Sequence, residues 1–461
     1  MFESNKKLIM LKFAFKTFAA AFAALLCASL FAETKTEGGY TLRLKAVKDG
    51  SEYKIGDTAQ FALYITKDGK PVDGIDVRSE ITKDTVNMGN TSQGKTKNGV
   101  FRASGKLSEA GFLKCRMRAE IPLADGKKKA VDMLAGAAFE PLKIKPSLPA
   151  PDDFDAYWAK QKKILAAIPA NAKATFVKSV GGIKVFDIQA DTFNGKLSGY
   201  LAYPENAEKG TLPAIITTHG WGVRGSSFNG VVAWAKRGFL AFDFNANGLP
   251  NGKPAQFYKD LKAGALKNYH IGDWKDRDGL FFRTLFMRDM RAIDFVVAQP
   301  QWDGKNLVVC GGSQGGGQAL AMGGLDSRVS IVVAGYPAIC DHSGPVAGRT
   351  SGWPHYTKLD KNGNYNKVAV ESARYVDAVN FAARIKGKTM YLINFADDVC
   401  EPTSSYAAYN NIKGEKRLWT NEEARHMPAA GTWQTVQKWA VDEVKKSSPK
   451  VRMTVDPKST W

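Results

Sequence analysis

Between residues 38 and 139, apolar and polar residues alternate with a period of two, and no long helical pattern interrupts them. A half-buried strand shows this alternation, because successive side chains point to opposite faces of its sheet. Short strands separated by turn residues predict an immunoglobulin-like β-sandwich domain, which we place at residues 33–140. The clearest of these runs are YTLRLKAV, AQFALYIT, GVFRASGKL and GFLKCRMRAEI.

A proline-rich stretch ends the alternating region. Residues 141–151 contain Pro141, Pro146, Pro149 and Pro151, and they predict a stiff linker or a wrap between two domains. The next run, FDAYWAKQKKILAAI, has helical periodicity. We expect Asp152 or Asp153 to cap that helix.

Beyond residue 173, apolar runs of strand length alternate with helical segments such as RDMRAIDFVVAQ. Strands that are apolar on both faces and separated by helices predict a mostly parallel sheet with helices on both sides, so we assign residues 152–461 to an α/β domain. Residues 250–285 and 341–372 lack this rhythm and are expected to cover the carboxyl ends of the strands, where ligands bind. The strand-like runs are PAIITTH, GFLAFDF, NLVVCG, SIVVAGYP and TMYLINFA.

The first 32 residues differ from both patterns. A basic region precedes an apolar run from Phe18 to Phe31, and the small residue Ala32 is followed by polar residues. A membrane anchor is the alternative, but this run is shorter than the roughly 20 residues of a spanning helix. We therefore predict a signal peptide at residues 1–32, cleavage near Ala32, and a secreted or periplasmic protein.

Composition and charge narrow the class of protein. A chain of 461 residues with 44% hydrophobic and 24% charged residues is typical of a globular protein with a large core. The formal net charge of +20 is spread along the chain, and no basic cluster interleaved with aromatic residues accompanies it. We interpret the charge as solvated surface and expect neither a nucleic acid nor a membrane as partner, while an anionic polysaccharide stays open.

Four cysteines follow the predicted signal peptide, too few for a disulfide framework in a chain of this size. We favour buried free thiols. A bridge between two of them is the alternative, because each of those two cysteines closes a strand-like run. The four are Cys115, Cys310, Cys340 and Cys400, and the last two form the candidate bridge.

The stretch LVVCGGSQGGGQAL contains the pattern G-x-S-x-G around Ser313. It follows an apolar strand and precedes a run compatible with a helix, which is the setting of a nucleophilic serine on a strained strand-to-helix turn. A glycine-rich phosphate or dinucleotide site is the alternative, but no G-x-G-x-x-G with a suitably spaced acid follows. We predict that Ser313 is a nucleophile.

A serine hydroxyl becomes a strong nucleophile only with the help of a base and an acid. In α/β domains with a nucleophilic serine on such a turn, the acid follows the serine in the chain and the histidine follows the acid. Of the five histidines, only His426 lies beyond the last strand-like run, TMYLINFA. Asp397 and Asp398 come directly after that run, so one of them should be the acid. A lone surface histidine is the alternative for His426.

The oxyanion of an acyl-transfer intermediate needs two amide donors. The residue after the serine supplies one, the amide of Gln314. The stretch PAIITTHGWG ends a buried strand, and its Gly220 would let the amide of Trp221 approach the reacting carbonyl, which leaves a structural role for His219. Nearby candidates for substrate binding, which could equally cover the sheet, are Arg224 and Trp353.

Several segments together resemble the acetyl xylan esterases and cephalosporin-C deacetylases of carbohydrate esterase family seven, in the α/β-hydrolase superfamily. The resemblance covers residues 151–445, and its most specific parts are the Ser-Gln-Gly-Gly turn and the acid-loop segment ending in Ala-Tyr-Asn. The segments are DDFDAYWAKQ, THGWG, FMRDMRAIDFVVAQPQWD, GGSQGGGQALA, VAGYPAICD, YVDAVNFAARIKGKTMYLINFADDVCEPTSSYAAYNNIKGEK and RHM.

The resemblance implies an α/β-hydrolase fold, a homo-oligomer, and Asp397 rather than Asp398 as the acid. It also implies the same nucleophile, base and oxyanion amides as the residues do: Ser313, His426, Trp221 and Gln314. Three segments depart from the family pattern. Residues 245–248 read Asn-Ala-Asn-Gly in place of Arg-Gly-Gln, Glu401 replaces a proline, and Met427 replaces a glutamate.

These observations predict an exported serine esterase that deacetylates carbohydrates such as acetylated xylan or xylo-oligosaccharides, without a metal or an organic cofactor. Two alternatives stay open, an exported α/β-hydrolase peptidase and a carbohydrate-binding protein with an inactive hydrolase domain. Large aromatic residues are expected to leave room for only a small acyl group, unless they pack in the core instead. They are Trp221, Phe281, Phe282, Trp353 and Tyr356.

Overall fold

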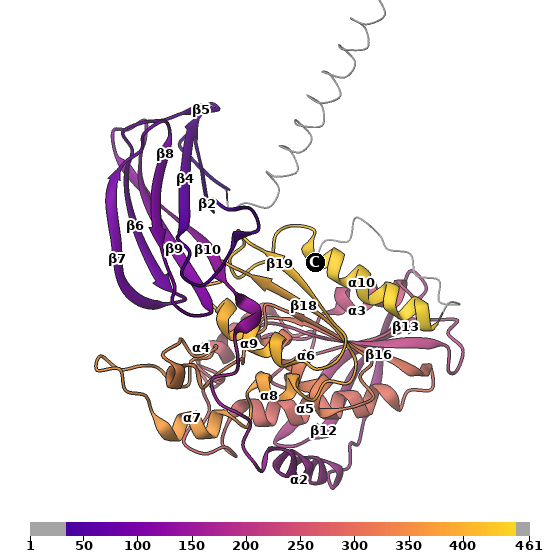
Figure 1. Ribbon diagram of the computed structural model, residues 1–461. Coiled ribbons are helices and arrows are strands. Elements are labelled where there is room, and N and C mark those ends of the chain that lie inside the picture. The colour runs from indigo at the N-terminus through magenta and orange to yellow at the C-terminus, as the bar shows by residue number, and fades with distance from the viewer. Residues whose placement is uncertain (1–33, 449–461) are drawn as a thin grey trace, which may run out of the picture.

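The structure is a computed structural model that describes residues 34–448. Figure 1 shows a strand-rich N-terminal body, drawn in indigo and violet, beside a larger body in which helices surround a twisted sheet. The signal peptide predicted for residues 1–32 lies outside the described residues. Within the described part of the chain, no helix has the length and apolarity needed to cross a membrane.

Two sheets build the N-terminal body and share one buried core. Their order is β1-β2-β4-β5, with β8 beside β4, and β3-β10-β9-β6-β7. Leu42 and Phe61 from the first sheet pack in one cluster with Cys115 and Met117 from the second. The strands are β1 (Thr34–Glu37), β2 (Tyr40–Ala46), β3 (Glu52–Tyr53), β4 (Ala59–Lys67), β5 (Lys70–Pro71), β6 (Asp76–Lys83), β7 (Val86–Lys95), β8 (Val100–Gly105), β9 (Gly111–Pro122) and β10 (Lys128–Phe139).

A nine-stranded sheet forms the centre of the larger body, in the order β11-β12-β13-β15-β14-β16-β17-β18-β19. The six strands from β15 to β19 run parallel, as predicted, whereas β11 to β13 form an antiparallel edge that the sequence analysis missed. The strands are β11 (Lys173–Val180), β12 (Ile183–Thr192), β13 (Gly195–Pro204), β14 (Leu212–Thr218), β15 (Leu240–Phe244), β16 (Trp302–Gly312), β17 (Ile331–Gly335), β18 (Lys388–Asn394) and β19 (Lys416–Asn421).

Helices cover both faces of this sheet, which explains why its central strands are apolar throughout. Ile216 and Val309 belong to the core cluster on one face, whereas their neighbours Ile215 and Val308 belong to the cluster on the other. The first face packs against α2 (Phe154–Ala166), α5 (Phe281–Val297), α6 (Gln314–Leu325), α8 (Ala378–Ala382) and α9 (Pro402–Asn411), and the second against α3 (Phe228–Lys236) and α10 (Thr432–Ser447).

The two segments that lack a strand-helix rhythm contain only short helices, apart from the start of α5 at the end of the first segment. These are α4 (Ala255–Ala263) in the first segment and η3 (Gly344–Ala347) and α7 (Lys367–Ala373) in the second. The segments meet where the ring of His270 stacks on Trp353, with centroids 5.1 Å apart. The two segments therefore contact each other.

The proline-rich stretch wraps along the larger body. After η2 (Pro141–Lys143), Ile144 joins the core of the α/β body, and both the amide and the hydroxyl of Ser147 donate to Asp341. The cap prediction for α2 was only half right. Asp153 occupies the N-cap position, but its side chain makes no capping bond, because it accepts hydrogen bonds from Arg277 and Tyr375 instead.

The four cysteines of the described residues are buried free thiols. Cys340 and Cys400 are both in the core cluster beneath α6 and α9, and the structure records no bridge between them. Burial raises the pKa of the Cys310 thiol to about 12. These thiols are therefore protonated and serve as small apolar side chains.

Candidate active site

Ser313 lies on the sharp turn between β16 and α6. Its backbone has φ 57° and ψ −124°, a conformation that costs energy in any residue with a side chain. The turn is held by close packing on both sides, where a Cβ on Gly315 would lie 2.5 Å from the carbonyl oxygen of Thr218. A Cβ on Gly312 would lie 2.7 Å from the hydroxyl of Tyr336. Glycines are thus required on both sides of the serine.

The structure brings Ser313, His426 and Asp397 into one chain of hydrogen bonds. Nε2 of His426 lies 3.0 Å from Oγ of Ser313, and Nδ1 lies 3.0 Å from Oδ2 of Asp397. His426 stands in the loop between β19 and α10, and Asp397 directly follows β18. Asp397 is 1% exposed. Asp398 points elsewhere and pairs with Arg425 at 2.5 Å.

The carboxylate of Asp397 is fixed by its own loop. Its Oδ1 accepts hydrogen bonds from the amides of Val399 and Cys400, both at 2.9 Å. Hydrogen bonds of this kind fix the orientation of a carboxylate. The backbone around His426 is tied in a similar way, because the Asn394 side chain donates to the carbonyl of Arg425 at 2.7 Å.

The loop after β14 passes close to Ser313. A Cβ on Gly220 would lie 3.5 Å from Cβ of Ser313 and 3.9 Å from its Oγ. The amide of Trp221 follows Gly220, and the amide of Gln314 follows Ser313. Among residues 34–448, neither amide donates a hydrogen bond to a protein acceptor. Both are therefore available beside the hydroxyl, as an oxyanion site requires.

Comparison with known proteins identifies the family. The acetyl xylan esterase (AXE1) family model matches residues 138–442, more than half of the chain. The acetyl esterase Axe7A of Xylanibacter ruminicola is 32% identical over 408 residues, which cover 85% of this chain and 88% of that protein. The chain belongs to the acetyl xylan esterase family. It is accordingly a carboxylic ester hydrolase of the acetyl esterase type.

Two solved structures confirm the α/β-hydrolase fold of this family member. An acetyl xylan esterase from Paenibacillus sp. R4 is 24% identical, with a TM-score of 0.56, and covers 65% of this chain and 98% of its own. Acetyl xylan esterase 1 from Thermoanaerobacterium sp. JW/SL YS485 is 22% identical, with a TM-score of 0.56, and the match covers 66% of this chain and 97% of that one. The match to Axe7A covers a larger share of the chain than either.

His219 of this esterase braces the loop of Gly220 and Trp221, in line with the structural role expected for it. Its Nδ1 donates to the carbonyl of Gly220 at 2.6 Å, and its Nε2 accepts from the amide of Ala246 at 3.3 Å. Burial lowers the pKa of His219 to about 4, so the ring is neutral. The guanidinium of Arg224 braces the same loop by donating to the carbonyl of Trp221 at 3.0 Å.

A row of aromatic rings lies beside the loop of Gly220 and Trp221 in the esterase. Nε1 of Trp221 donates to Nδ1 of His270 at 3.0 Å, and His270 stacks on Trp353. The hydroxyl of Tyr356 donates to the carbonyl of His270 at 3.0 Å. Phe282, by contrast, is fully buried in the core. The sequence analysis missed His270, because a segment without periodicity gives no sign of which residues it brings together.

The three departures from the family pattern leave the hydrogen-bonded chain intact. Asn245 is buried and closes its own turn, accepting from the amide of Leu249 and donating to its carbonyl. Met427 is 69% exposed. Glu401 is only 2% exposed, and burial raises its pKa to about 8. Within the described residues, no group of three or more His, Cys, Asp or Glu could hold a metal ion.

Proposed function

We propose that this protein is an exported esterase that removes acetyl groups from the sugar hydroxyls of acetylated xylan or its oligosaccharides. The catalytic residues of this proposal are Ser313 as nucleophile, His426 as base and Asp397 as acid. One observation carries it, the unbroken chain of two 3.0 Å contacts from the Ser313 hydroxyl through His426 to Asp397. Membership of the acetyl xylan esterase family supports the substrate class.

In the proposed first step, Oγ of Ser313 attacks the carbonyl carbon of the acetyl ester while Nε2 of His426 takes the hydroxyl proton. The tetrahedral oxyanion accepts hydrogen bonds from the amides of Trp221 and Gln314. Asp397 stabilises the imidazolium that forms and keeps Nδ1 protonated. The sugar alcohol then leaves with the proton from Nε2.

In the second step, water replaces the sugar. Its proton goes to Nε2 of His426 as its oxygen attacks the acetyl-serine carbonyl, and collapse of the intermediate releases acetate and restores Ser313. Every proton in this cycle passes through Nε2. The rigid turn at Ser313 positions the hydroxyl, and the short loop at Asp397 positions the carboxylate, so that both keep their contacts with His426.

Export is part of the proposal and rests on the basic, apolar and small-residue pattern of residues 1–32. Its test is separate from the test of catalysis. The mature protein, recovered from the periplasm or medium of the producing cell, should begin near Glu33. A cytosolic protein that keeps Met1 to Ala32 would contradict export and leave the esterase proposal unaffected.

The enzymatic test compares three substrates: 4-nitrophenyl acetate, a peptide 4-nitroanilide and acetylated xylo-oligosaccharide. We expect hydrolysis of the aryl acetate, release of acetate from the oligosaccharide, and no release of nitroaniline. Ser313→Ala should lower turnover by roughly 10⁴-fold or more without loss of fold. Cleavage of the anilide would favour a peptidase. Oligosaccharide binding without hydrolysis would favour a binding protein.

A further inference from the structure

The loop that carries Asp397 rests directly on the β-sandwich. The centroid of the Phe112 ring on β9 lies 5.1 Å from that of Phe395. Although β9 is a strand of the sandwich, Phe112 belongs to the core of the α/β body. A Cβ on Gly136 of β10 would overlap the carbonyl oxygen of Phe395. Residues 395–401, here called the acid loop, therefore have a face of the sandwich as their floor.

Lys114 of β9 reaches from that floor to the acid itself. Its Nζ donates a hydrogen bond of 2.5 Å to the backbone carbonyl of Asp397, across 283 positions of sequence. Lys114 is 5% exposed. The backbone of Asp397 is thus held from the sandwich side, while its carboxylate is held by loop amides and faces His426.

Two buried carboxyl groups accompany the ammonium of Lys114. Asp84 is 1% exposed and Glu401 is 2% exposed. Burial raises the pKa of both groups, and the positive charge of Lys114 partly offsets the rise. A buried ammonium is stable only when its hydrogen bonds are satisfied, so the carbonyl of Asp397 is an important partner for it.

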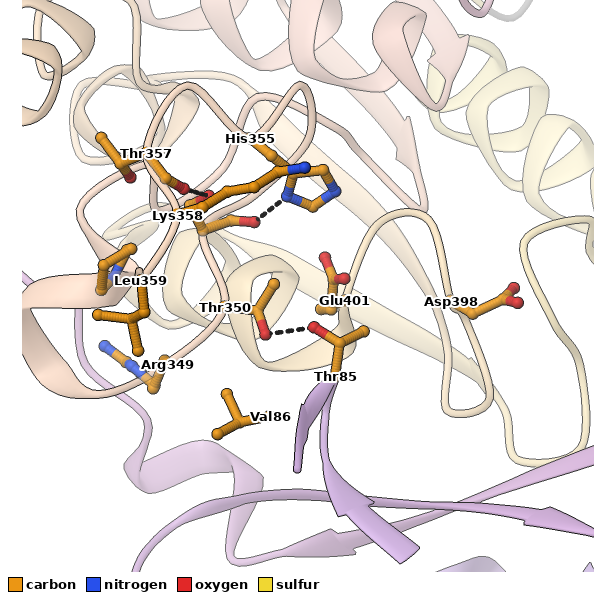
Figure 2. A pocket seen from close by; sticks show the side chains of 12 residues that line it. Thr85, Val86, Arg349, Thr350, His355, Thr357, Lys358, Leu359, Asp398 and Glu401 are labelled. Carbon is orange, nitrogen blue, oxygen red and sulfur yellow. Dashed lines mark hydrogen bonds between the residues drawn. The ribbon is translucent and has the colours of Figure 1, made fainter. Parts of the chain in front are cut away.

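Figure 2 shows the edge of this contact. Thr85 of the sandwich and Thr350 of the α/β body share a hydrogen bond of 2.6 Å, and Glu401 lies beside them at a cavity of about 400 Å³. Glu401 is also the position at which the acid loop departs from the family pattern. The ionisable side chain of Glu401 therefore appears where the added domain supplies a lysine.

We propose that Lys114 is a positioning residue of the esterase. From the sandwich it holds the backbone of Asp397, so that the carboxylate keeps its contact with His426 during turnover. The sandwich is then a working part of the catalytic unit and not an independent appendage. This inference rests on the proposed function, because it assumes that Asp397 is the catalytic acid.

The test replaces Lys114 with methionine, which fills similar space but cannot donate a hydrogen bond. The matched control is Lys83→Met, because Lys83 is also a largely buried sandwich lysine, and its ammonium pairs with Glu109 in the same domain. In Lys114→Met, kcat on 4-nitrophenyl acetate should fall about 10- to 100-fold while KM stays within twofold. Lys83→Met should retain kcat within about twofold.

A rescue variant separates positioning from simple packing. Lys114→Arg keeps a cationic donor and should recover kcat to within about threefold of the unmodified enzyme. All assays are run at a temperature at which circular dichroism shows the variants folded. If Lys114→Met does not fold there, Lys114→Arg decides the question alone, and a tenfold loss of kcat in that folded variant would overturn the proposal.

The outcomes also separate this inference from the proposed function. If Ser313→Ala is inactive but folded Lys114→Met keeps kcat within twofold, the positioning role is wrong and the triad stands. An equal loss of kcat in Lys114→Met and Lys83→Met would overturn it as well, because the effect would then be general to the domain. If Ser313→Ala remains active, the proposed function itself fails.

Discussion

The two ends of the hydrogen-bonded chain are held in place by different means. The Ser313 turn connects a strand and a helix of one body, and its Gly315 is pressed against the backbone of β14. The acid loop is held by its own amides and by a second domain, through Lys114 and the ring of Phe112. Ser313 is thus fixed by close packing within the α/β body, whereas Asp397 also depends on contacts with a second domain.

The two ends should therefore be sensitive to different changes. Close packing at the serine allows almost no change in volume, because any added atom meets backbone that cannot move away. The acid loop contains buried charge, so its stability depends on protonation and on the partner domain. Each of the following predictions changes one end and leaves the other intact.

The largest effect should follow from changing Asp397, the proposed catalytic acid. Asp397→Asn should lower kcat about 10⁴-fold, because an amide cannot stabilise the imidazolium on His426. Asp398→Asn is the matched control, since its carboxylate pairs with Arg425 and not with His426. We expect it to change kcat less than about threefold. Similar losses in both variants, measured on 4-nitrophenyl acetate, would contradict the assignment of the acid.

At the serine end, Gly315→Ala should destabilise the protein by about 1–3 kcal/mol and lower kcat, because the new methyl group must displace the backbone of Thr218. Gly414→Ala is the control, since its Cβ would lie at least 3.6 Å from its neighbours. Thermal unfolding and kcat are measured together. A Gly315→Ala protein with unchanged melting temperature would show that the turn is less rigid than its packing indicates.

The same difference explains what the sequence could predict. Ser313 and its glycines are adjacent in the chain, and the strands around them are apolar throughout, so a local pattern indicated both the turn and the sheet. Asp397 and His426 could be placed because each follows a strand in a known order. Of the missed antiparallel strands, β11 is exposed along nearly its whole length, which leaves no apolar face to detect.

The contact of Lys114 could not be predicted from the pattern that placed its strand. Alternation puts Lys114 on the polar face of β9 together with Arg116 and Arg118, where solvent is the ordinary expectation. The α/β body covers only the first part of that face, so Lys114 is buried while Arg116 and Arg118 remain exposed. Burial here depends on where a second domain packs.

At the serine end, the row of rings beside Trp221 predicts a graded preference for small acyl groups. Efficiency on 4-nitrophenyl esters should fall steadily from acetate to butyrate and be negligible for octanoate, since each methylene changes discrimination by about 1–3 kcal/mol. Trp221→Ala keeps the amide of the proposed oxyanion site and should raise kcat/KM on the butyrate ester relative to the acetate ester about tenfold. Trp419→Ala, at another exposed tryptophan, is the control. An optimum at butyrate in the unmodified enzyme would contradict the aromatic barrier.

The smallest effect concerns pH and the acid end. Burial raises the pKa of Glu401 from an ordinary value of 4.5 to about 8, although Lys114 opposes the rise, whereas Asp84 and Asp397 add to it. The folded state therefore favours the protonated carboxyl. The stability that this gives is complete below about pH 4.5 and is lost as the pH rises through about 8.

Glu401→Gln removes this dependence, because an amide resembles the protonated carboxyl and cannot ionise. The melting temperature of the variant relative to the unmodified protein should rise between pH 5 and pH 8 by at least about 2 °C. Glu371→Gln is the control, because its carboxylate is exposed and pairs with Arg374 at the surface of α7. The melting temperature of Glu401→Gln relative to the unmodified protein could instead stay constant between the two pH values, or fall. Either result would show that the acid loop does not bury a neutral carboxyl against the sandwich.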